Sequence, residues 1–381
     1  MGYTLQPAQG DSFVNREDLL DEILSDLEDR NSTIGYALYG VRRIGKTSVF
    51  RETERRLKHR KDIVVIYFSV WDLIEESLSE FCRKLSFSII ESYAPHLGLK
   101  YRIRDLLRAP ADLLKKILSK AEFKAVYDNL EFLLSLKEDQ GNDNMLIENT
   151  FDLPERLAEQ TNTKCVLLVD EFPSITGLKF NGAKIGYSII KKIRTSVENW
   201  QHCTLCISGS IRSTMVSTAI SSASPFYRQL VVKEVKPLPR KYVGELLSRH
   251  ADISGEAIDE IYRFSGGIPF YVQFLGKTLQ HYNEKQDLGL IKKIENDFLR
   301  EEGDLLFREE FNYLSSKEKQ IIIAIAKGNS RPSEIKEAVR GEISNINTFL
   351  SYLEEKGYVS RQEKACYVIC DPPFCRWLAE R

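Results

Sequence analysis

The sequence predicts an α/β protein in which a parallel sheet is followed by two mainly helical parts. Continuous, largely apolar runs of strand length occur at 62–70, 164–171 and 203–210. Such runs are typical of parallel strands that are covered on both faces. An earlier run at 32–40 ends on a glycine and leads into a segment with helical spacing, and most of the chain after 239 also has helical spacing. Strands alternating with helices, and then helices, indicate an α/β core with helical additions.

Length and composition limit the class of protein. The chain has 381 residues, of which 43% are hydrophobic, which is enough for a sizeable core and for two or three domains. Its 54 basic and 55 acidic residues leave a net charge of −1, so any contact with nucleic acid would be local. Because no apolar run approaches the roughly 20 residues that span a bilayer and the start lacks a signal-peptide core, we expect a cytoplasmic protein without membrane contact.

The seven cysteines form an odd count, and Cys203 and Cys206 stand close together in one of the apolar runs. Buried thiols in a reducing compartment would explain them. The C-x-x-C spacing of this pair leaves a zinc or disulfide role open.

The first elements follow from local patterns. Apolar residues spaced three and four apart over 20–27 predict a helix, with Asn15 as its N-cap and Asp18 as the capping-box partner. The β-forming run at 32–40 is expected to be the first strand. A glycine turn follows, and a helix is expected over 45–60.

The remaining patterns divide the chain into three expected domains. Residues 1–238 form the core, which a helical insertion at 72–160 interrupts. The run at 229–239 is expected to be an edge strand of the core, because it carries charges. Residues 239–310 are expected to form a small helical lid. In residues 311–381 three helical segments precede a two-strand hairpin, which predicts a winged helix.

The segment between the first strand and its helix carries the clearest motif. It fits G-x-x-x-x-G-K-[ST] in the expected context of strand and helix. The glycines let backbone N–H groups and the helix N-terminus face anionic phosphates. We expect Lys46 to pair with the β- and γ-phosphates and Thr47 to bind Mg²⁺. The residues expected to hold the nucleotide in this loop are Gly40, Val41, Arg42, Arg43, Ile44, Gly45, Lys46, Thr47 and Ser48.

An acidic pair, Asp170 and Glu171, ends the apolar run at 164–171. Parallel strands place such residues at the edge of the sheet where ligands bind. Asp170 is expected to hold Mg²⁺ through water, and Glu171 to polarise the attacking water. An isolated acidic pair of this kind would also suit a helix start. Together with the phosphate loop, the pair predicts hydrolysis of a nucleoside triphosphate.

Less specific signals accompany these motifs. Ser208 and Ser210 end the third apolar run, where a hydroxyl would contact the γ-phosphate or cap a turn. Arg228 precedes the edge strand, either as a finger on a neighbouring subunit's phosphate or as a surface arginine. Gly267 and Pro269 lie in a bend of the lid, which would either cover the base or ribose or serve as an ordinary loop.

Arg42 and Arg43 lie inside the phosphate-loop motif and have two interpretations. They add positive charge close to bound phosphate, or they pair with acids of the insertion at 72–160. The sequence favours neither interpretation.

With these segments assembled, the chain resembles the archaeal AAA-type ATPase family, a branch of the signal-transducing STAND ATPases that is related to the origin-recognition ATPases. The resemblance covers the chain except for 72–160 and rests on the order of its segments, which are FVNREDLLDEI, YGVRRIGKTSVF, LLVDEF, ISGSIRSTM, SPFYRQL, VKPLP and FSGGIPFYVQFLGK. It implies an AAA+-like P-loop NTPase fold with a parallel sheet of order 5-1-4-3-2, a helical lid and a C-terminal winged helix. It also implies that ATP and Mg²⁺ bind between the core and the lid.

The resemblance assigns roles to individual residues. Lys46 and Thr47 match the family's P-loop pair, and Asp170 and Glu171 match its Walker B pair. Ser208 matches the sensor region. The lid signature is matched by Gly266, Gly267 and Pro269. Similar sequences read Tyr-Gly-Arg at the finger position, whereas here Tyr227 directly precedes Arg228. The finger role of Arg228 therefore departs from the family pattern.

The expected winged helix is a candidate DNA interface. Eleven basic and nine acidic residues over 311–381 give a net charge of +2, which is too small an excess to predict tight nonspecific binding. Polar and basic side chains near the expected third helix would contact base edges or phosphates, and a protein partner or another domain would use the same surface. The residues expected at a DNA interface are Lys336, Arg340, Asn345, Asn347, Arg361 and Lys364.

Two functions follow from these motifs. In the first, the chain is an ATP-binding, slowly hydrolysing switch whose ATP or ADP state repositions the winged helix on double-stranded DNA or on a protein partner, which includes a second copy of the chain. In the second, it is a non-catalytic interaction module that ATP stabilises.

Overall fold

The computed structural model describes residues 3–97, 143–210, 215–249, 253–282, 286–339 and 345–381. Among these residues, no helix is both long enough and apolar enough to cross a bilayer.

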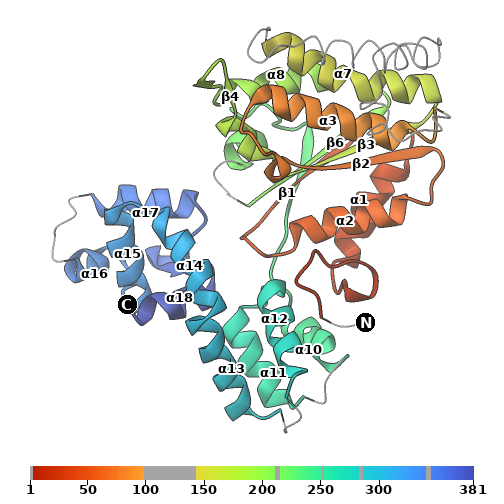
Figure 1. Ribbon diagram of the computed structural model, residues 1–381. Coiled ribbons are helices and arrows are strands. Elements are labelled where there is room, and N and C mark those ends of the chain that lie inside the picture. Colours follow the sequence, from red (N-terminus) through yellow and green to blue (C-terminus); the bar gives the residue numbers. More distant parts are fainter. Residues whose placement is uncertain (1–2, 98–142, 211–214, 250–252, 283–285, 340–344) are drawn as a thin grey trace.

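A five-stranded parallel sheet forms the centre of the core (Figure 1). The strands lie in the order β2-β3-β6-β1-β7, which confirms the expected order 5-1-4-3-2. Their bounds are Gly35–Tyr39 (β1), Ile63–Ser69 (β2), Lys164–Asp170 (β3), Cys203–Gly209 (β6) and Leu230–Glu234 (β7). β3 and β6 are buried along their whole length, as continuous apolar runs predict. β7 pairs with β1 alone and is an edge strand, as its charges predicted.

Helices cover both faces of the sheet (Figure 1). On one face lie α1 (Glu17–Glu28) and α2 (Lys46–Leu57), and on the other lie α3 (Leu78–Tyr93), α7 (Asp143–Thr161) and α8 (Ser188–Val197). Alternate residues of β3 serve the two sides, since Val166 and Leu168 join one buried cluster and Leu167 and Val169 join the other. Short strands β4 (Lys179–Phe180) and β5 (Ala183–Lys184) form a separate hairpin.

The first helix buries the predicted apolar stripe, but its predicted cap is wrong. Leu20, Ile23, Leu24 and Leu27 are buried, as expected. The N-cap position is occupied by Arg16 with φ 93°, and no side chain caps the helix. The Asn15 side chain instead accepts a hydrogen bond from the Arg16 backbone N–H at 2.8 Å. Asn15 itself has φ 59°, so the chain turns in the left-handed region before the helix begins.

The insertion at 72–160 contributes α3 and most of α7 to the described structure. The two helices pack on each other and on the sheet through apolar side chains such as Phe81 and Phe151. The other helical segments expected in the insertion lie outside the described residues.

After the sheet, the segment expected to be a lid begins with four described helices: α10 (Arg240–Ser248), α11 (Gly255–Ser265), α12 (Pro269–Leu279) and α13 (Leu288–Arg300). We refer to residues 239–301 as the lid. The bend between α11 and α12 depends on Gly267, which has φ 74°. A Cβ at this position would lie 2.2 Å from the Leu238 carbonyl oxygen. Only glycine allows this close approach, and the Leu238 N–H donates to the Gly267 carbonyl at 2.8 Å.

The C-terminal segment contains the expected three helices and hairpin, together with two helices that the sequence did not predict. The expected elements are α15 (Ser316–Ala326), α16 (Pro332–Ala338), α17 (Ile346–Glu355), β8 (Val359–Arg361) and β9 (Tyr367–Ile369). The two others are α14 (Glu302–Asn312) and α18 (Pro372–Ala379), which pack against each other. The predicted boundary at 310/311 falls inside α14. We refer to residues 302–381 as the C-terminal unit.

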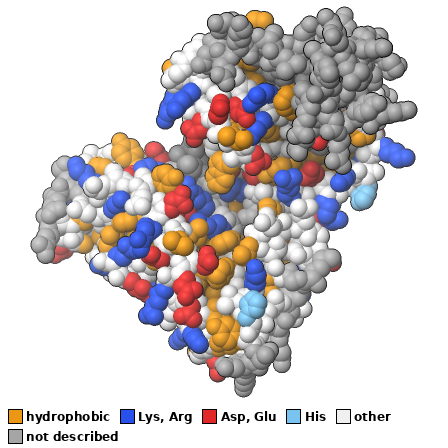
Figure 2. Space-filling model, in the orientation of Figure 1, with side chains coloured by type: hydrophobic (Ala, Val, Ile, Leu, Met, Phe, Trp, Pro, Cys, Tyr) orange, Lys and Arg blue, Asp and Glu red, His pale blue; other side chains and the backbone are white. Residues whose placement is uncertain are grey.

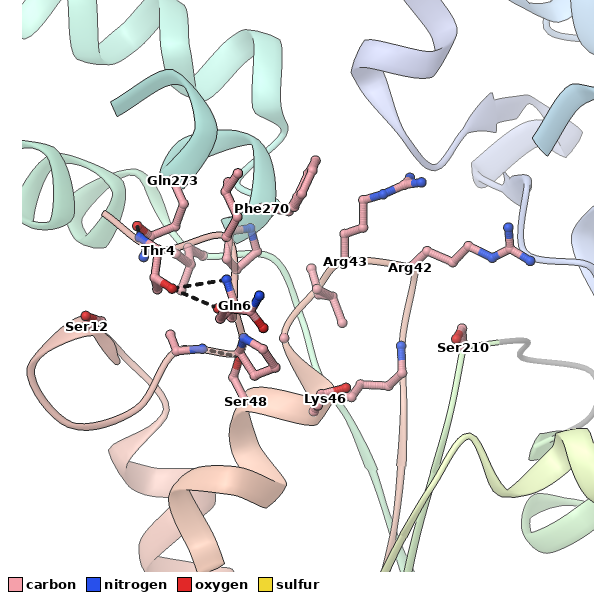
Figure 3. Close-up of a pocket in the computed structure, with 18 of the residues that line it drawn as sticks. Thr4, Gln6, Ser12, Arg42, Arg43, Lys46, Ser48, Ser210, Phe270 and Gln273 are labelled. Carbon is pink, nitrogen blue, oxygen red and sulfur yellow. Dashed lines mark hydrogen bonds between the residues drawn. The ribbon is translucent and has the colours of Figure 1, made fainter. Parts of the chain in front are cut away.

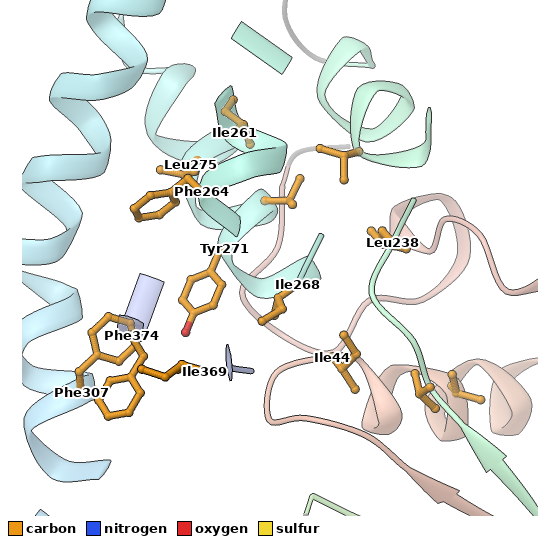
Figure 4. Packing of buried hydrophobic residues seen from close by; sticks show 14 of the residues in the cluster. Ile44, Leu238, Ile261, Phe264, Ile268, Tyr271, Leu275, Phe307, Ile369 and Phe374 are labelled. Atoms are coloured by element: carbon orange, nitrogen blue, oxygen red, sulfur yellow. The ribbon is translucent and has the colours of Figure 1, made fainter. Parts of the chain in front are cut away.

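One buried cluster joins the core, the lid and the C-terminal unit. Figure 4 shows Ile44 of the phosphate loop, Tyr271 of α12, and Phe307 and Phe374 of the C-terminal unit as parts of this packing. The rings of Tyr271 and Phe307 lie 6.3 Å apart between centroids. The three segments expected to be domains therefore share buried apolar surface, which favours their docking in this arrangement.

Candidate functional site

The segment Gly40–Ser48 forms a tight loop between β1 and α2. Gly40 has φ 156°, and a Cβ there would lie 2.6 Å from the Val235 carbonyl oxygen. Gly45 has φ 97° and stands at the N-cap position of α2, which begins at Lys46. The first turn of α2 thus has unpaired backbone N–H groups beside the loop, an arrangement that suits an anion.

Lys46 is buried, with 5% of its surface exposed. Its Nζ donates to the carbonyl oxygens of Gly40 at 3.0 Å and Val41 at 3.1 Å. Burial lowers the pKa of Lys46, and the nearby carboxylates of Glu171 and Asp170 oppose that shift. The ammonium group is therefore held within the loop, close to both acidic residues.

Asp170, at the end of β3, accepts hydrogen bonds from three hydroxyl groups. Its Oδ2 accepts from Thr47 Oγ1 at 2.6 Å and from the Tyr67 hydroxyl at 3.0 Å, and its Oδ1 accepts from the Ser208 hydroxyl. Ser208 is fully buried, so this hydrogen bond to the carboxylate lies in the protein interior. These bonds fix the carboxylate next to the hydroxyl of Thr47.

Glu171 follows in the left-handed region, with φ 51°. Its carboxylate accepts from the Ser210 hydroxyl and from the Ser210 backbone N–H, the latter at 3.3 Å. Burial raises the pKa of Glu171 above its usual range, although Lys46 and the hydrogen bonds from Ser210 oppose the shift. A carboxylate with a raised pKa is a stronger base than an ordinary one, which suits proton abstraction.

These residues border a cavity of about 660 Å³. Its walls come from the phosphate loop, the ends of β3 and β6, the N-terminal segment, lid helix α12 and helix α14. Figure 3 shows residues of the loop, the N-terminal segment and α12 around it. Part of the wall is apolar, with Phe13, Val14, Leu238 and Leu246, and part is polar, with Lys46 and the other charged residues. A volume of this size with an apolar part and convergent polar groups is typical of a small-molecule site.

The N-terminal segment is a wall of the cavity that the sequence did not predict. The Ala8 N–H donates to Ser48 Oγ at 3.0 Å, and the Thr4 N–H donates to Gln273 Oε1 at 3.1 Å (Figure 3). The segment therefore joins α2 to the lid across the cavity. Residues 4–8 carry no motif that would have identified this role.

The predicted site residues outside the loop differ in whether they line the cavity. Pro269 lines it, whereas Gly267 packs against the Leu238 backbone. Arg228 is exposed, with its guanidinium 5.3 Å from the Tyr227 ring centroid, and is not among the lining residues.

Arg42 and Arg43 do not point at Lys46 but extend toward the C-terminal unit (Figure 3). Both pair with Glu310 of α14, at 3.5 Å from Arg42 and 2.6 Å from Arg43. Arg43 also lies 3.6 Å from Asp371. The arginines thus pair with acids, as one interpretation held, but these acids belong to the C-terminal unit and not to the insertion.

The residues expected to contact DNA lie on the C-terminal unit. Lys336, Asn345, Asn347 and Arg361 are exposed. Arg340 and the side chain of Lys364 lie outside what the structure describes. Figure 2 shows basic, acidic and hydrophobic side chains interspersed over the visible face of this unit.

The cysteines form no disulfide in the described part of the structure. All seven lie among the described residues, and Cys203 and Cys206 are buried in β6. In the described part of the chain, no group of three or more His, Cys, Asp or Glu side chains is placed to hold a metal ion.

Comparison with known proteins relates this geometry to nucleotide hydrolysis. A family model described as "ATPase domain predominantly from Archaea" matches residues 13–275. An uncharacterized ATP-binding protein of Methanocaldococcus jannaschii, MJ0075, is 27% identical over 320 residues, which are 77% of this chain and 82% of that protein. A second protein of that organism, MJECL04, is 31% identical over 202 residues, and the match spans 52% of this chain but only 42% of that longer protein.

Solved structures show the same fold. The Walker-type ATPase PABY2304 of Pyrococcus abyssi has a TM-score of 0.71 at 19% identity, with 98% of this chain and 99% of that chain covered. The ORC2 protein of Aeropyrum pernix, in its ADPNP–ADP complexes, has a TM-score of 0.54 at 12% identity, with 95% and 90% covered. These likenesses extend over the lid and the C-terminal unit as well as the sheet.

Proposed function

Because the chain belongs to the family of ATPase domains found predominantly in Archaea, we propose that it binds ATP with Mg²⁺ at the phosphate loop and hydrolyses it slowly. We also propose that the nucleotide state acts on the C-terminal unit, which binds DNA or a protein partner. The roles of the individual residues below belong to this proposal.

The observation that carries the proposal is the contact between Thr47 Oγ1 and Asp170 Oδ2 at 2.6 Å, beside Lys46 and Glu171. A hydroxyl and a carboxylate oxygen in contact are hard oxygen donors, which Mg²⁺ prefers. Magnesium in nucleotide sites takes few protein ligands and completes its shell with phosphate oxygens and water. Thr47 and Asp170 therefore fit a magnesium ion, which would neutralise charge on the phosphates.

The remaining groups of the site supply binding and proton transfer. Backbone N–H groups at the start of α2 would bind the phosphates, and Lys46 would exchange its two carbonyl acceptors for phosphate oxygens. Glu171 would take a proton from the attacking water as that oxygen bonds to the γ-phosphorus and the bond to ADP breaks. Ser210 holds the Glu171 carboxylate, and Ser208 holds Asp170, so both serines act as positioning residues in this scheme.

The apolar part of the cavity would bind the nucleoside. It lies between the N-terminal segment and α12, where Gln273 and backbone groups of residues 4–8 offer hydrogen bonds and Phe270 offers an aromatic face. The site thus joins a phosphate end and a base end of different chemistry.

Steady-state phosphate release tests the catalytic part. Glu171→Gln should abolish turnover and keep ATP binding, because the amide fills the same space but takes no proton. Asp62→Asn changes a carboxylate just before β2, at the amino ends of the parallel strands and away from Asp170, and should leave turnover unchanged. Unaltered turnover in Glu171→Gln would contradict the catalytic assignment. Tight ATP binding without turnover in the wild type would favour the non-catalytic interaction module.

DNA binding by the C-terminal unit is tested by duplex titration at two salt concentrations. Lys336→Ala and Arg361→Ala should weaken binding and reduce its salt dependence, since both side chains are exposed and basic. If no duplex binds at low salt, the output is a protein partner or a second copy of the chain. Arg228 would act as a finger only in such an assembly.

A further inference from the structure

The C-terminal unit makes two kinds of contact with the rest of the chain. Its contact with the lid has a large apolar part, in which the ring of Phe307 packs 6.3 Å from Tyr271 and 6.2 Å from Phe298, between centroids. That contact also contains the ion pair of Arg376 with the buried Glu295 at 2.8 Å, which lies outside the cavity lining. Its contact with the phosphate loop is ionic, through Glu310 and Asp371. An apolar contact responds little to an added anion, whereas an ion pair exchanges partners when a competing anion arrives.

The ionic contact is centred on Glu310, whose side chain is 9% exposed. Arg43, with 16% of its side chain exposed, lies 2.6 Å from it, and Arg42, with 40% exposed, lies 3.5 Å from it. The Tyr271 hydroxyl, within 3.3 Å of Arg43, donates to Asp371 at 2.6 Å. The cluster therefore binds together the phosphate loop, α12, α14 and the start of α18.

Charged side chains of this cluster also line the cavity. Four basic side chains line it, namely Arg16, Arg42, Arg43 and Lys46, and three acidic ones, namely Glu171, Glu309 and Glu310. Two of the three acids come from α14. Docking of α14 thus adds two negative charges to the lining of the cavity and pairs two of its four positive charges with Glu310.

The C-terminal unit also reaches the catalytic side of the cavity. A Cβ at Gly357, in the turn after α17, would lie 3.8 Å from the carbonyl oxygen of Ser210, whose hydroxyl holds Glu171. Tyr358, the next residue, donates from its hydroxyl to the Glu310 carbonyl at 3.1 Å. The turn after α17 is therefore hydrogen-bonded to α14 and lies beside the residue that positions the proposed base.

We propose that Arg42, Arg43 and Glu310 form a phosphate-sensitive latch, in which the triphosphate of a bound nucleotide competes with Glu310 for the two arginines and so loosens the C-terminal unit from the phosphate loop. The proposal rests on the proposed function, because it takes the cavity to be a nucleotide site. The lid and the C-terminal unit stay joined through their apolar contact and move together. By linkage, docking of α14 weakens triphosphate binding by the same factor by which the triphosphate weakens docking.

Two measurements on the full-length chain test the latch. The first is titration with a fluorescent, non-hydrolysable ATP analogue and Mg²⁺. Glu310→Gln should tighten binding about fivefold to tenfold, which lies within the usual range of such coupling. Glu302→Gln is the matched control, because it removes an equal charge from the same helix, at an exposed position outside the cavity lining, and leaves the partners of Arg42 and Arg43 in place. It should change affinity by less than about twofold.

The second measurement is hydrogen exchange of the α14 backbone, residues 302–312, first in the wild type and then in Glu310→Gln. The latch predicts faster exchange when the ATP analogue and Mg²⁺ are added, and fast exchange without nucleotide in Glu310→Gln. Unchanged or slower exchange on nucleotide binding overturns the latch, as do equal effects of the two substitutions or a weaker affinity in Glu310→Gln. These failures all require that the wild type binds nucleotide. If it binds none, the proposed function itself fails.

Discussion

Substituting Asp371 should change how the stability of the chain depends on pH. Its carboxylate accepts from the Tyr271 hydroxyl at 2.6 Å and from the Phe374 N–H at 3.0 Å, where it caps α18, and Arg43 lies 3.6 Å away. Burial raises the pKa of Asp371 to about 6, against 3.8 for an ordinary aspartate. The folded state therefore binds this proton more tightly than the unfolded chain.

The sign and the size of the effect follow from that difference. The stabilisation by the bound proton is complete below about pH 4 and is lost as the pH rises to about 6. A difference of about two pKa units corresponds to roughly 3 kcal/mol at most, because each unit is worth about 1.4 kcal/mol. The side chain is 16% exposed, so screening by solvent reduces the value somewhat.

Urea unfolding of the wild type and of Asp371→Asn at pH 4, 5, 6 and 7 tests this reasoning. The amide does not titrate and still accepts the capping hydrogen bond, so the variant should gain up to about 3 kcal/mol on the wild type between pH 4 and pH 7. In Asp304, a control on α14, hydrogen bonds from Trp377 and Arg308 lower the pKa. A lowered pKa gives stability that is lost only below the ordinary value of about 3.8, so Asp304→Asn should show no such gain between pH 4 and pH 7. Parallel pH profiles for the wild type and Asp371→Asn would refute the assigned burial effect.

Three further predictions concern the bend, the metal ligands and the proposed base. Gly267→Ala should lower the melting temperature far more than Gly182→Ala, because both glycines have φ near 75° but only the Cβ at Gly267 meets Leu238; equal losses of about 1–2 kcal/mol would contradict the clash. Thr47→Ala should weaken ATP-analogue binding about tenfold in Mg²⁺ and hardly at all in EDTA, as measured by fluorescence titration; equal losses in both would exclude a metal role. Phosphate release should fall with decreasing pH through a pKa above the usual value of about 4.3, because burial raises the pKa of Glu171; an acid limb at the usual value would show that another group controls it.

The sheet was predictable because its signals are local. The segments that form β2, β3 and β6 are each continuously apolar, so each run by itself predicts a strand that is buried on both faces. The charges of β7 likewise marked it as an edge strand. The strand order was supplied by the resemblance to a family and not by the runs.

Part of the site was predictable for the same reason. The phosphate loop is one continuous segment, so its motif brings Gly40, Gly45 and Lys46 together without knowledge of the fold. The contact between Thr47 and Asp170 follows once both are placed at the carboxyl edge of one sheet.

Contacts between distant segments were not predictable. Arg43 pairs with Glu310 and Asp371, which lie 267 and 328 residues further along the chain. Thr4 bonds to Gln273 across 269 residues. A pairing of this kind depends on how the lid and the C-terminal unit pack, which no local pattern records. The sequence could indicate that Arg43 needs an acid but not which one.

The helix caps and the unexpected helices show a different limit. Asn15 has the right residue type for an N-cap, but the backbone of Arg16 takes the left-handed conformation and α1 starts without a side-chain cap. α14 was missed because no separate pattern marks it: it follows α13 after a single residue and lies across the predicted boundary at 310/311. Tertiary packing, and not propensity, decided both outcomes.

A structure of the full-length chain with Mg²⁺ and a non-hydrolysable ATP analogue tests the central claim most directly. The account predicts the triphosphate along residues 40–48, with the metal ion between Thr47 and Asp170 and a water within hydrogen-bond reach of Glu171. A nucleotide bound elsewhere, or phosphates that contact neither the loop nor the metal, would contradict it.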